Sequence, residues 1–520
     1  MHVPASTAVL RVPNCHVFFP STHPESGPPR SLQLYRTSCP SSPSFAHPVA
    51  ARMAARQESD NLAWDRSDEL WEEATKQVRL SSTCRNVEVF AERVLGKPAT
   101  LVPPLIIGGF NVLYPIRGVE GHSNNLLVRL PCPNQTIAPT EKTLTEAATS
   151  AFIHQHTQVP VPKALHYGDD PEIGPFMIIP DLGTRRGMSD ALEAPRDDPN
   201  DTPVLNPNIS EDKLRSLYGK LARCVLQLVQ PTFPRIGALV ETYPGSFGVL
   251  GRPITLNMNN MVQLSNIPKS IFPPKGTTYQ TADEWYVELA TMQMATLLFQ
   301  HNDMVSSEDD CRNKYVARQL FLRFAKQGRL SKFGFSDDDW PVNILVDQDD
   351  DILGVIDWEL AYAAPTQFIL DPPWWLLLDV PEMWDDGIDD WASVYHKRLD
   401  TWLSAMEQAE EDTSPISLPL SAYMRESWAT GRFWLNYAAR KSWTFDTIFW
   451  QYLDERFFGE REKDIPKESL WKTRLDLLSE EERAAMEPLV QIKMEESQTR
   501  VLVDWDAEEA RKHLSSFLFD

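Results

Sequence analysis

The sequence predicts an α+β, two-lobed fold in which a small antiparallel sheet precedes a large, mainly helical lobe. Two patterns indicate this fold. Between residues 101 and 130, short apolar runs alternate with Gly and Asn turns, which is typical of an antiparallel meander. Farther along, apolar residues recur at helical spacing over residues 213–229, 282–330, 389–411 and 421–458.

The composition limits the classes of function. The chain has 520 residues, enough for about three units of ~150 residues each. It contains no run of about 18 uncharged apolar residues, so we expect no membrane-spanning helix. A formal charge of -23 argues against a nucleic-acid partner, because binding DNA or RNA requires Lys and Arg to neutralise phosphates. An acidic surface suits a cationic or neutral small substrate, and it serves solubility equally well.

The six cysteines are scattered singly, with no Cys-x-x-Cys pair and no His at zinc-finger spacing. This pattern favours reduced thiols and argues against structural zinc.

Residues 1–56 differ from the rest of the chain, since they are rich in Arg, Ser and Pro and contain one acid, Glu25. Such a composition is typical of a mitochondrial transit peptide. A disordered extension, or a true translation start at Met53, would also account for it. The expected location is therefore mitochondrial or cytoplasmic.

The first lobe is expected over residues 101–183, after a helical extension over 57–100. A strand over 101–107 should run into a Gly-rich turn, followed by strands over 112–116 and 126–130. A helix over 140–157 should end before the prolines at 160 and 162, and a buried strand over 176–179 should complete the sheet.

The helical lobe is expected over residues 184–460, with insertions. Residues 184–210 are polar and rich in Pro and Asp, which indicates a loop. Residues 232–282 carry many Pro, Gly and Asn residues, so we expect them to cross the surface. Residues 461–520 form a C-terminal extension with helical spacing.

The stretch with the clearest chemistry runs from residue 335 to 373. Asp338 lies five residues before Asn343, at the start of an apolar strand; an acidic turn and a second strand follow, ending at Asp357. Such a hairpin can return the side chains of Asn343 and Asp357 to one edge. Phosphoryl transfer needs magnesium held by hard oxygen ligands and an acceptor hydroxyl held in line.

These residues resemble a known family. Asp338-x-x-x-x-Asn343-Ile344-Leu345-Val346, with Val355-Ile356-Asp357-Trp358-Glu359, is similar to the aminoglycoside phosphotransferase and choline kinase-like superfamily. Residues 361–365 and 371–377 resemble a fungal branch related to the altered-inheritance-of-mitochondria phosphotransferase-like proteins. The resemblance covers about 101–460 and implies a protein-kinase-like fold. It also implies ATP and Mg²⁺ as cofactors and a kinase activity toward a hydroxyl of an unidentified small molecule, with no oligomeric state specified.

The resemblance also assigns roles in the helical lobe. Asp338 would orient and deprotonate the acceptor hydroxyl, and Asn343 and Asp357 would hold the magnesium ion. Asp371 would brace the catalytic loop. Independently of the resemblance, acidic side chains of this lobe such as Glu382, Asp385 and Asp386 are candidates to line a site for a cationic acceptor.

In the first lobe, the family plan places the nucleotide. Arg129 would stand where relatives have a nucleotide-binding Lys, with Glu146 on the next helix as its partner. Asp181 would belong to the hinge that meets the adenine. The loop that covers the phosphates would consist of Gly108, Gly109, Phe110 and Asn111.

Two positions depart from the family pattern. Relatives carry a His where this chain has Ser336, and a basic or imidazole group where it has Trp340. Losing electrostatic help beside the phosphate costs about a hundredfold or more in rate. The alternative hypothesis is therefore an impaired pseudokinase that serves as a nucleotide-binding or scaffold protein. A protein kinase is disfavoured, because no Ala-Pro-Glu-like motif follows Asp357.

Overall fold

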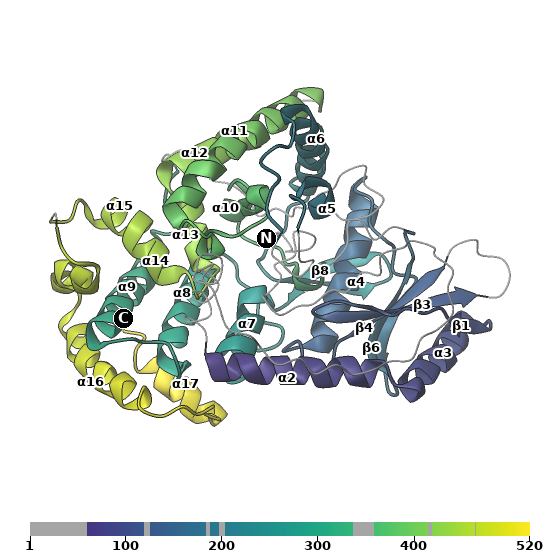
Figure 1. Cartoon of the computed structure of the whole chain (residues 1–520), viewed down its shortest axis with the longest axis horizontal. Coiled ribbons are helices and arrows are strands. Elements are labelled where there is room, and N and C mark those ends of the chain that lie inside the picture. Colours follow the sequence, from purple (N-terminus) through teal and green to yellow (C-terminus); the bar gives the residue numbers. More distant parts are fainter. Residues whose placement is uncertain are drawn as a thin grey trace, which may run out of the picture.

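The expected two-lobed α+β fold is confirmed (Figure 1). The structure, a computed structural model, describes residues 60–118, 125–183, 188–196, 203–335, 358–413, 419–462 and 464–519. Within these residues a small antiparallel sheet lies beside a much larger group of helices. No described helix is long and apolar enough to cross a membrane.

The sheet of the first lobe has the strand order β1-β3-β4-β6-β5, with β2 also paired to β3, and every pairing is antiparallel. The expected strand over 101–107 is split into β1 and β2, because Pro103 and Pro104 between them have no N–H to donate. The strands are β1 (Ala99–Leu101), β2 (Ile106–Ile107), β3 (Asn111–Gly118), β4 (Leu126–Pro131), β5 (His166–Asp170) and β6 (Gly174–Pro180).

Helices cover both faces of this sheet. Successive residues of a strand point to opposite faces, so Val128 and Leu127 of β4 enter different apolar clusters. Val128 packs with Phe90 of α3 (Ser81–Leu95), and Leu127 packs with Ala147 of α4 (Pro139–His156). Helix α4 also contributes Phe152 to the core of the helical lobe, so it lies between the two lobes.

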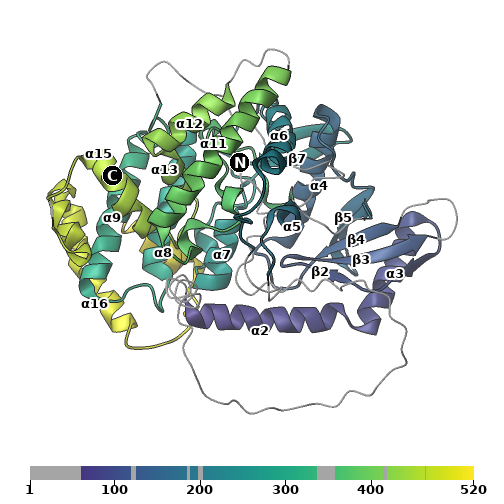
Figure 2. The ribbon, with the colours of Figure 1, turned by 45° about the horizontal axis from the view of Figure 1, so that its top comes forward.

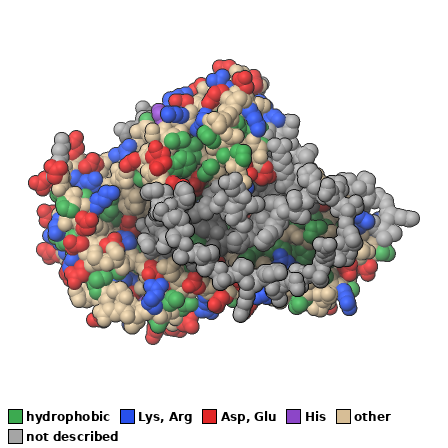
Figure 3. All heavy atoms as spheres, in the orientation of Figure 1, with side chains coloured by type: hydrophobic (Ala, Val, Ile, Leu, Met, Phe, Trp, Pro, Cys, Tyr) green, Lys and Arg blue, Asp and Glu red, His purple; other side chains and the backbone are tan. Residues whose placement is uncertain are grey.

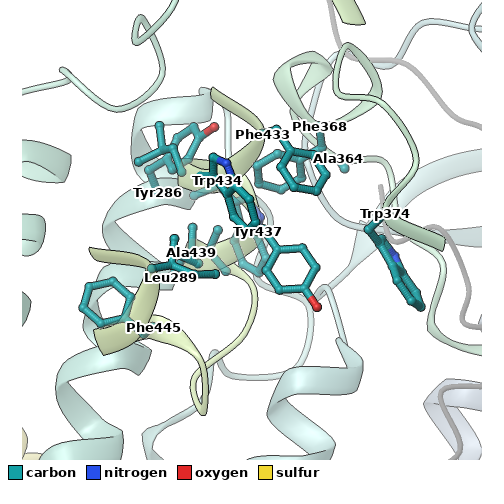
Figure 4. Close-up of a cluster of buried hydrophobic side chains, with 14 of the residues drawn as sticks. Tyr286, Leu289, Ala364, Phe368, Trp374, Phe433, Trp434, Tyr437, Ala439 and Phe445 are labelled. Carbon is teal, nitrogen blue, oxygen red and sulfur yellow. The ribbon is translucent and has the colours of Figure 1, made fainter. Parts of the chain in front are cut away.

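The helical lobe is organised around a core rich in aromatic residues, part of which Figure 4 shows. Trp374 and Trp375, expected in the core, are buried. The longer helices of this lobe are α6 (Glu211–Leu228), α8 (Ala282–Phe299), α9 (Glu308–Lys326), α11 (Ile388–Asp412), α12 (Leu420–Thr430), α13 (Arg432–Ala439), α16 (Glu480–Glu496) and α17 (Ala507–Ser515). Its short helices are α5 (Met188–Leu192), α10 (Thr366–Ile369), α14 (Phe445–Ile448) and α15 (Asp454–Phe458).

The expectation that residues 232–282 cross the surface is wrong. They form the β7–β8 hairpin (Ala238–Tyr243 and Ser246–Gly251) and α7 (Leu256–Ser265). Ile236 and Met258 of this stretch are almost fully buried. Apolar residues stand here singly among Pro, Gly and Asn, so neither the helical nor the strand period is continuous enough to reveal the buried side chains.

Helix α2 (Asn61–Val78) connects the lobes as a strut (Figures 1 and 2). At its N-terminus, Asp60 accepts hydrogen bonds from the helix and one of 2.8 Å from Asn302 of the helical lobe. At the other end, the Tyr114 hydroxyl of β3 donates to the Val78 carbonyl at 2.9 Å. Eighteen helical residues span about 27 Å, enough to reach from one lobe to the other.

On the face shown in Figure 3, acidic side chains are spread over the helical lobe and interspersed with Lys and Arg. On this face the acidic side chains are therefore distributed rather than gathered in one patch.

Candidate active site

The residues proposed for chemistry, Asp338, Asn343 and Asp357, lie within 336–357, outside the described residues. Ser336 and Trp340 lie there too. The assigned roles of these residues therefore stay predictions. No group of three or more His, Cys, Asp or Glu side chains able to hold a metal ion occurs among the described residues.

The described chain resumes at Trp358, and the next residue enters a buried group of charges between the lobes. We call Asn111, Arg129, Lys142, Glu146 and Glu359 the interlobe charge cluster; all five are buried. Lys142 Nζ lies 2.5 Å from Glu359 Oε2 and 2.7 Å from Asn111 Oδ1. Arg129 Nη2 lies 3.0 Å from both Glu359 Oε2 and Glu146 Oε1. Asn111 Nδ2 also donates to Glu359 Oε2.

Three separate elements bring the cluster together. Arg129 sits in the centre of the sheet on β4, opposite Leu113 of β3 and Met177 of β6. Lys142 and Glu146 are four residues apart on α4, so both face the sheet. Glu359 arrives from a 3₁₀ turn at 358–360, which packs against α4. The cluster thus ties the helical lobe to the sheet at a point two residues beyond Asp357.

The charges of the cluster compensate one another. Two cations, Arg129 and Lys142, face two carboxylates, Glu146 and Glu359. Burial raises the pKa of Glu359, but Lys142 and Arg129 outweigh it and hold that pKa at about 2, so the carboxylate stays ionised. Buried charges are stable only when they are paired and hydrogen-bonded, and this condition is met here.

The Gly-rich segment expected to cover phosphates forms a tight turn between β2 and β3. The Gly108 N–H donates to the Asn111 carbonyl at 2.8 Å, and Cys132 N–H donates to the Phe110 carbonyl at 2.9 Å. Gly109 lies at the tip of this turn. The Asn111 side chain is hydrogen-bonded to Lys142 and Glu359 of the interlobe charge cluster, and the role of this turn in covering phosphates stays a prediction.

The expected hinge follows β6 directly. The Asp181 N–H donates to the Asn125 carbonyl at 2.9 Å, and the Asp181 side chain accepts a hydrogen bond of 3.0 Å from the Gly183 N–H. These bonds turn the chain sharply as it leaves the sheet for the helical lobe.

Asp371 is buried in the helical lobe, where Ser427 Oγ and Asn436 Nδ2 donate to it at 2.6 and 2.8 Å. Burial raises the pKa of this carboxyl, while Arg432, 3.7 Å away, acts in the opposite direction. Arg432 also donates to the Gly334 carbonyl at 2.8 Å. Asp371 is therefore connected through Arg432 to the chain at residue 334, and its role in bracing the catalytic loop stays a prediction.

Glu382 is already engaged by neighbouring side chains. It accepts hydrogen bonds from the Tyr437 hydroxyl at 2.7 Å and from Trp443 Nε1 at 3.0 Å. The buried ammonium of Lys441 lies 5.1–5.5 Å from the ring centres of Trp374, Tyr437 and Trp443. Burial lowers the pKa of Lys441 to about 8, although the Glu382 charge opposes this. The other two acidic residues named for acceptor binding are exposed, Asp385 and Asp386.

Sequence reasoning missed two members of the cluster. It gave no role to Lys142, and it quoted Glu359 only as part of a motif. The spacing of Lys142 and Glu146 was the available signal, because residues four apart share one helix face. The contact between Lys142 and Glu359 joins residues 217 positions apart, which no local pattern reveals.

No family model and no curated protein sequence matches the chain. Among solved structures it is similar to a macrolide 2'-phosphotransferase type I, with a TM-score of 0.35 and 12% identity over 79% of this chain and 97% of that one. The chain is also similar to a thermostable mutant of an aminoglycoside phosphotransferase bound to AMP-PNP and hygromycin B, with a TM-score of 0.31 and 11% identity over 78% of this chain and 98% of that one. A putative aminoglycoside phosphotransferase from Ralstonia eutropha has a TM-score of 0.32 and 12% identity, over 70% of this chain and 98% of that one.

At such low identities and TM-scores these similarities carry no argument about function, which must come from the residues of the chain. The resemblance to the fungal branch is not tested by them and stays a prediction.

Proposed function

We propose that the chain is a phosphotransferase that uses ATP and magnesium to phosphorylate a hydroxyl of a small molecule. The observation that carries the proposal is the buried Arg129–Glu146 ion pair, joined to Glu359 two residues after Asp357. γ-Phosphoryl transfer in kinases uses a strand cation paired with a helix carboxylate, next to carboxylate and amide ligands for magnesium.

The chemical roles follow from residue type. Asp338 accepts the proton of the acceptor hydroxyl. Asn343 and Asp357 supply the amide and carboxylate oxygens that magnesium prefers, so the donor set fits this ion. A magnesium ion held by Asn343 and Asp357 would supply positive charge that offsets the charge of the phosphates. Lys142 and Arg129 fix Glu359, which makes them positioning residues for the neighbouring Asp357.

The cluster also implies that nucleotide binding depends strongly on magnesium. Because the positive charge of Arg129 is shared between two carboxylates, it is mostly compensated before a nucleotide arrives. A triphosphate must then find its counter-charge elsewhere. We expect chelation of the metal to weaken ADP binding by more than about tenfold.

Glu382 is a weaker candidate for binding a cationic acceptor, because its negative charge already acts on the buried ammonium of Lys441. We propose an acceptor that binds through its hydroxyl groups and does not require a net positive charge.

The second candidate is a nucleotide-binding protein without transfer activity, favoured by Ser336 and Trp340. Neither side chain supplies the positive charge that relatives place beside the transferred phosphate. Nucleotide binding without any phosphorylated product is the result expected of this candidate.

The decisive experiment incubates the purified protein with labelled ATP, magnesium and a metabolite mixture, and measures phosphorylated products. Asp338→Ala and Asp357→Ala should each lower turnover by at least about a hundredfold. Asp337→Asn and Asp339→Asn are the matched controls, because they change neighbouring carboxylates of the same acidic run and should retain turnover.

Two outcomes would contradict the proposal. Unchanged turnover in Asp357→Ala would remove the assigned metal role. Absence of product from every metabolite, together with magnesium-dependent ADP binding in a thermal-shift titration, would favour the non-catalytic candidate.

We also propose import into mitochondria, on the composition of residues 1–56 alone. A fluorescent protein fused behind residues 1–60 should co-localise with a mitochondrial marker. Diffuse cytoplasmic fluorescence would contradict import.

A further inference from the structure

Three segments that are far apart in the sequence meet where the strut helix α2 begins. They are residues 60–61 at the N-terminus of α2, residues 302–303 between α8 and α9, and residues 500–501 between α16 and α17. From this end, α2 runs along the outside of the molecule to α3 beside the sheet (Figures 1 and 2). We call the residues that meet here the strut junction: Asp60, Asn61, Asn302, Asp303, Arg500 and Val501.

Two carboxylates serve the first N–H groups of α2, which have no partner within the helix. Asp60 accepts hydrogen bonds from the N–H groups of Leu62 and Ala63 at 2.9 and 3.0 Å. The N–H of Asn61 donates to Asp303 Oδ2 at 3.2 Å, so part of the cap of α2 comes from the helical lobe. A negative charge at this position is also favourable, because the N-terminus of a helix carries a partial positive charge. The helical lobe therefore completes the end of the strut that it contacts.

The C-terminal extension holds the same two residues of the helical lobe. The buried amide of Asn302 donates to the Val501 carbonyl and to Asp60, each at 2.8 Å, and accepts from the Val501 N–H at 3.2 Å. Asp303 accepts two hydrogen bonds from Arg500, at 2.7 and 2.8 Å. These two bonds are the main reason why the pKa of Asp303 is lowered, so its carboxylate stays ionised. Asn302 and Asp303 therefore each join α2 on one side to the C-terminal extension on the other.

The backbone at Asp303 depends on these contacts. Its φ of 59° lies in the left-handed region, which costs energy for any residue other than Gly, although Asp and Asn tolerate it best. The bonds from Asn61 and Arg500 offset this cost, so losing either partner should loosen the turn.

We propose that the strut junction is a latch through which the C-terminal extension sets the position of the sheet lobe relative to the helical lobe. With residues 500–501 in place, the connection at 302–303 holds the N-terminus of α2. The helix transmits this restraint to the sheet, where the Tyr114 hydroxyl donates to the Val78 carbonyl. When residues 500–501 move away, α2 loses its anchor and the sheet lobe gains freedom. Because Arg500 is half exposed, a change at the surface acts at the far end of a helix about 27 Å long. This inference concerns the arrangement of the lobes and does not depend on the proposed function.

Hydrogen exchange of the full chain, measured by mass spectrometry, tests the first step of the latch. Asp303→Asn keeps a residue that tolerates the left-handed backbone but removes the charge that Asn61 and Arg500 share, so residues 61–67 should exchange about fivefold faster. Arg500→Gln is the second variant, because its half-exposed side chain can be replaced without opening the core; here we expect about a twofold increase. Arg425→Gln breaks a similarly exposed ion pair elsewhere and should leave the exchange of α2 unchanged.

Single-molecule energy transfer on the same variants tests the second step. Dyes attached through ketone-bearing amino acids at Lys97, before the sheet, and Lys397 of α11, both exposed, report the distance between the lobes. Asp303→Asn should broaden the distance distribution relative to wild type and Arg425→Gln. The broadening should increase when Glu359→Gln is added, because this change weakens the other connection between the lobes. Unchanged exchange in α2, or faster exchange with an unchanged distance distribution, would show that α4 alone positions the sheet and overturn the inference.

Discussion

Replacing Glu359 by Gln tests the interlobe charge cluster most directly. The substitution keeps the shape of the side chain and removes the negative charge that lies 2.5 Å from Lys142 and 3.0 Å from Arg129. Glu146 then remains as the single carboxylate for two buried cations. Removing one partner of a buried pair costs about 3–5 kcal/mol, because the other charge stays buried without compensation.

Urea unfolding followed by tryptophan fluorescence measures this loss as a shift of the midpoint at constant slope. The matched control is Glu407→Gln, which breaks an ion pair with Arg425 in which both side chains are about half exposed. Exposed pairs contribute about 0–1 kcal/mol, so the control should stay close to wild type.

The double variant Glu359→Gln with Lys142→Met separates charge imbalance from loss of packing. Removing both charges leaves Arg129 paired with Glu146, so the double variant should be more stable than Glu359→Gln alone. A loss of less than about 1 kcal/mol in Glu359→Gln, or additive losses in the double variant, would refute the electrostatic account of the cluster.

Three further predictions concern the rest of the fold. The pKa of Lys441 is lowered to about 8 in the folded protein. Above pH 8 the folded protein has therefore released a proton that the unfolded chain still binds, up to the ordinary pKa of a lysine. The free energy of unfolding should rise with pH over this range. Lys441→Met should be more stable than the wild type at pH 7, and its stability should not rise above pH 8 as that of the wild type does. Urea midpoints measured on either side of pH 8 will show both effects. Asp60→Ala removes the cap of the α2 strut and should cost about 1–2 kcal/mol in urea unfolding, with faster hydrogen exchange in α2 and unchanged exchange in α16. Gly334→Ala forces a side chain onto a backbone with φ of 75° and against Thr430, so its thermal midpoint should fall, whereas Gly219→Ala on α6 should not lower it.

The sequence predicted those elements whose signals are continuous. The helix expected over 140–157 is α4 (Pro139–His156), because an uninterrupted pattern ends at prolines that stop a helix. The prediction that residues 232–282 cross the surface was wrong, because their buried residues are separated by turn-forming ones. These residues become part of the core only through contacts with distant helices. Within the candidate site, Arg129 and Glu146 lie together as the resemblance implies. Glu359 could not be connected to Lys142, since that contact exists only once the lobes are assembled.

Helix α4 determines how far the two lobes can move without disturbing the site. One face of α4 packs Ala147 against the sheet, and the other contributes Phe152 to the core of the helical lobe. Its Lys142 holds Glu359, and its Glu146 holds Arg129. A rotation of the sheet away from α4 would have to break these buried ion pairs, which is far more costly than bending the exposed connections. Any closure of the lobes around a ligand must therefore carry the sheet, α4 and the chain at 359 as one unit, while the more distant helices adjust.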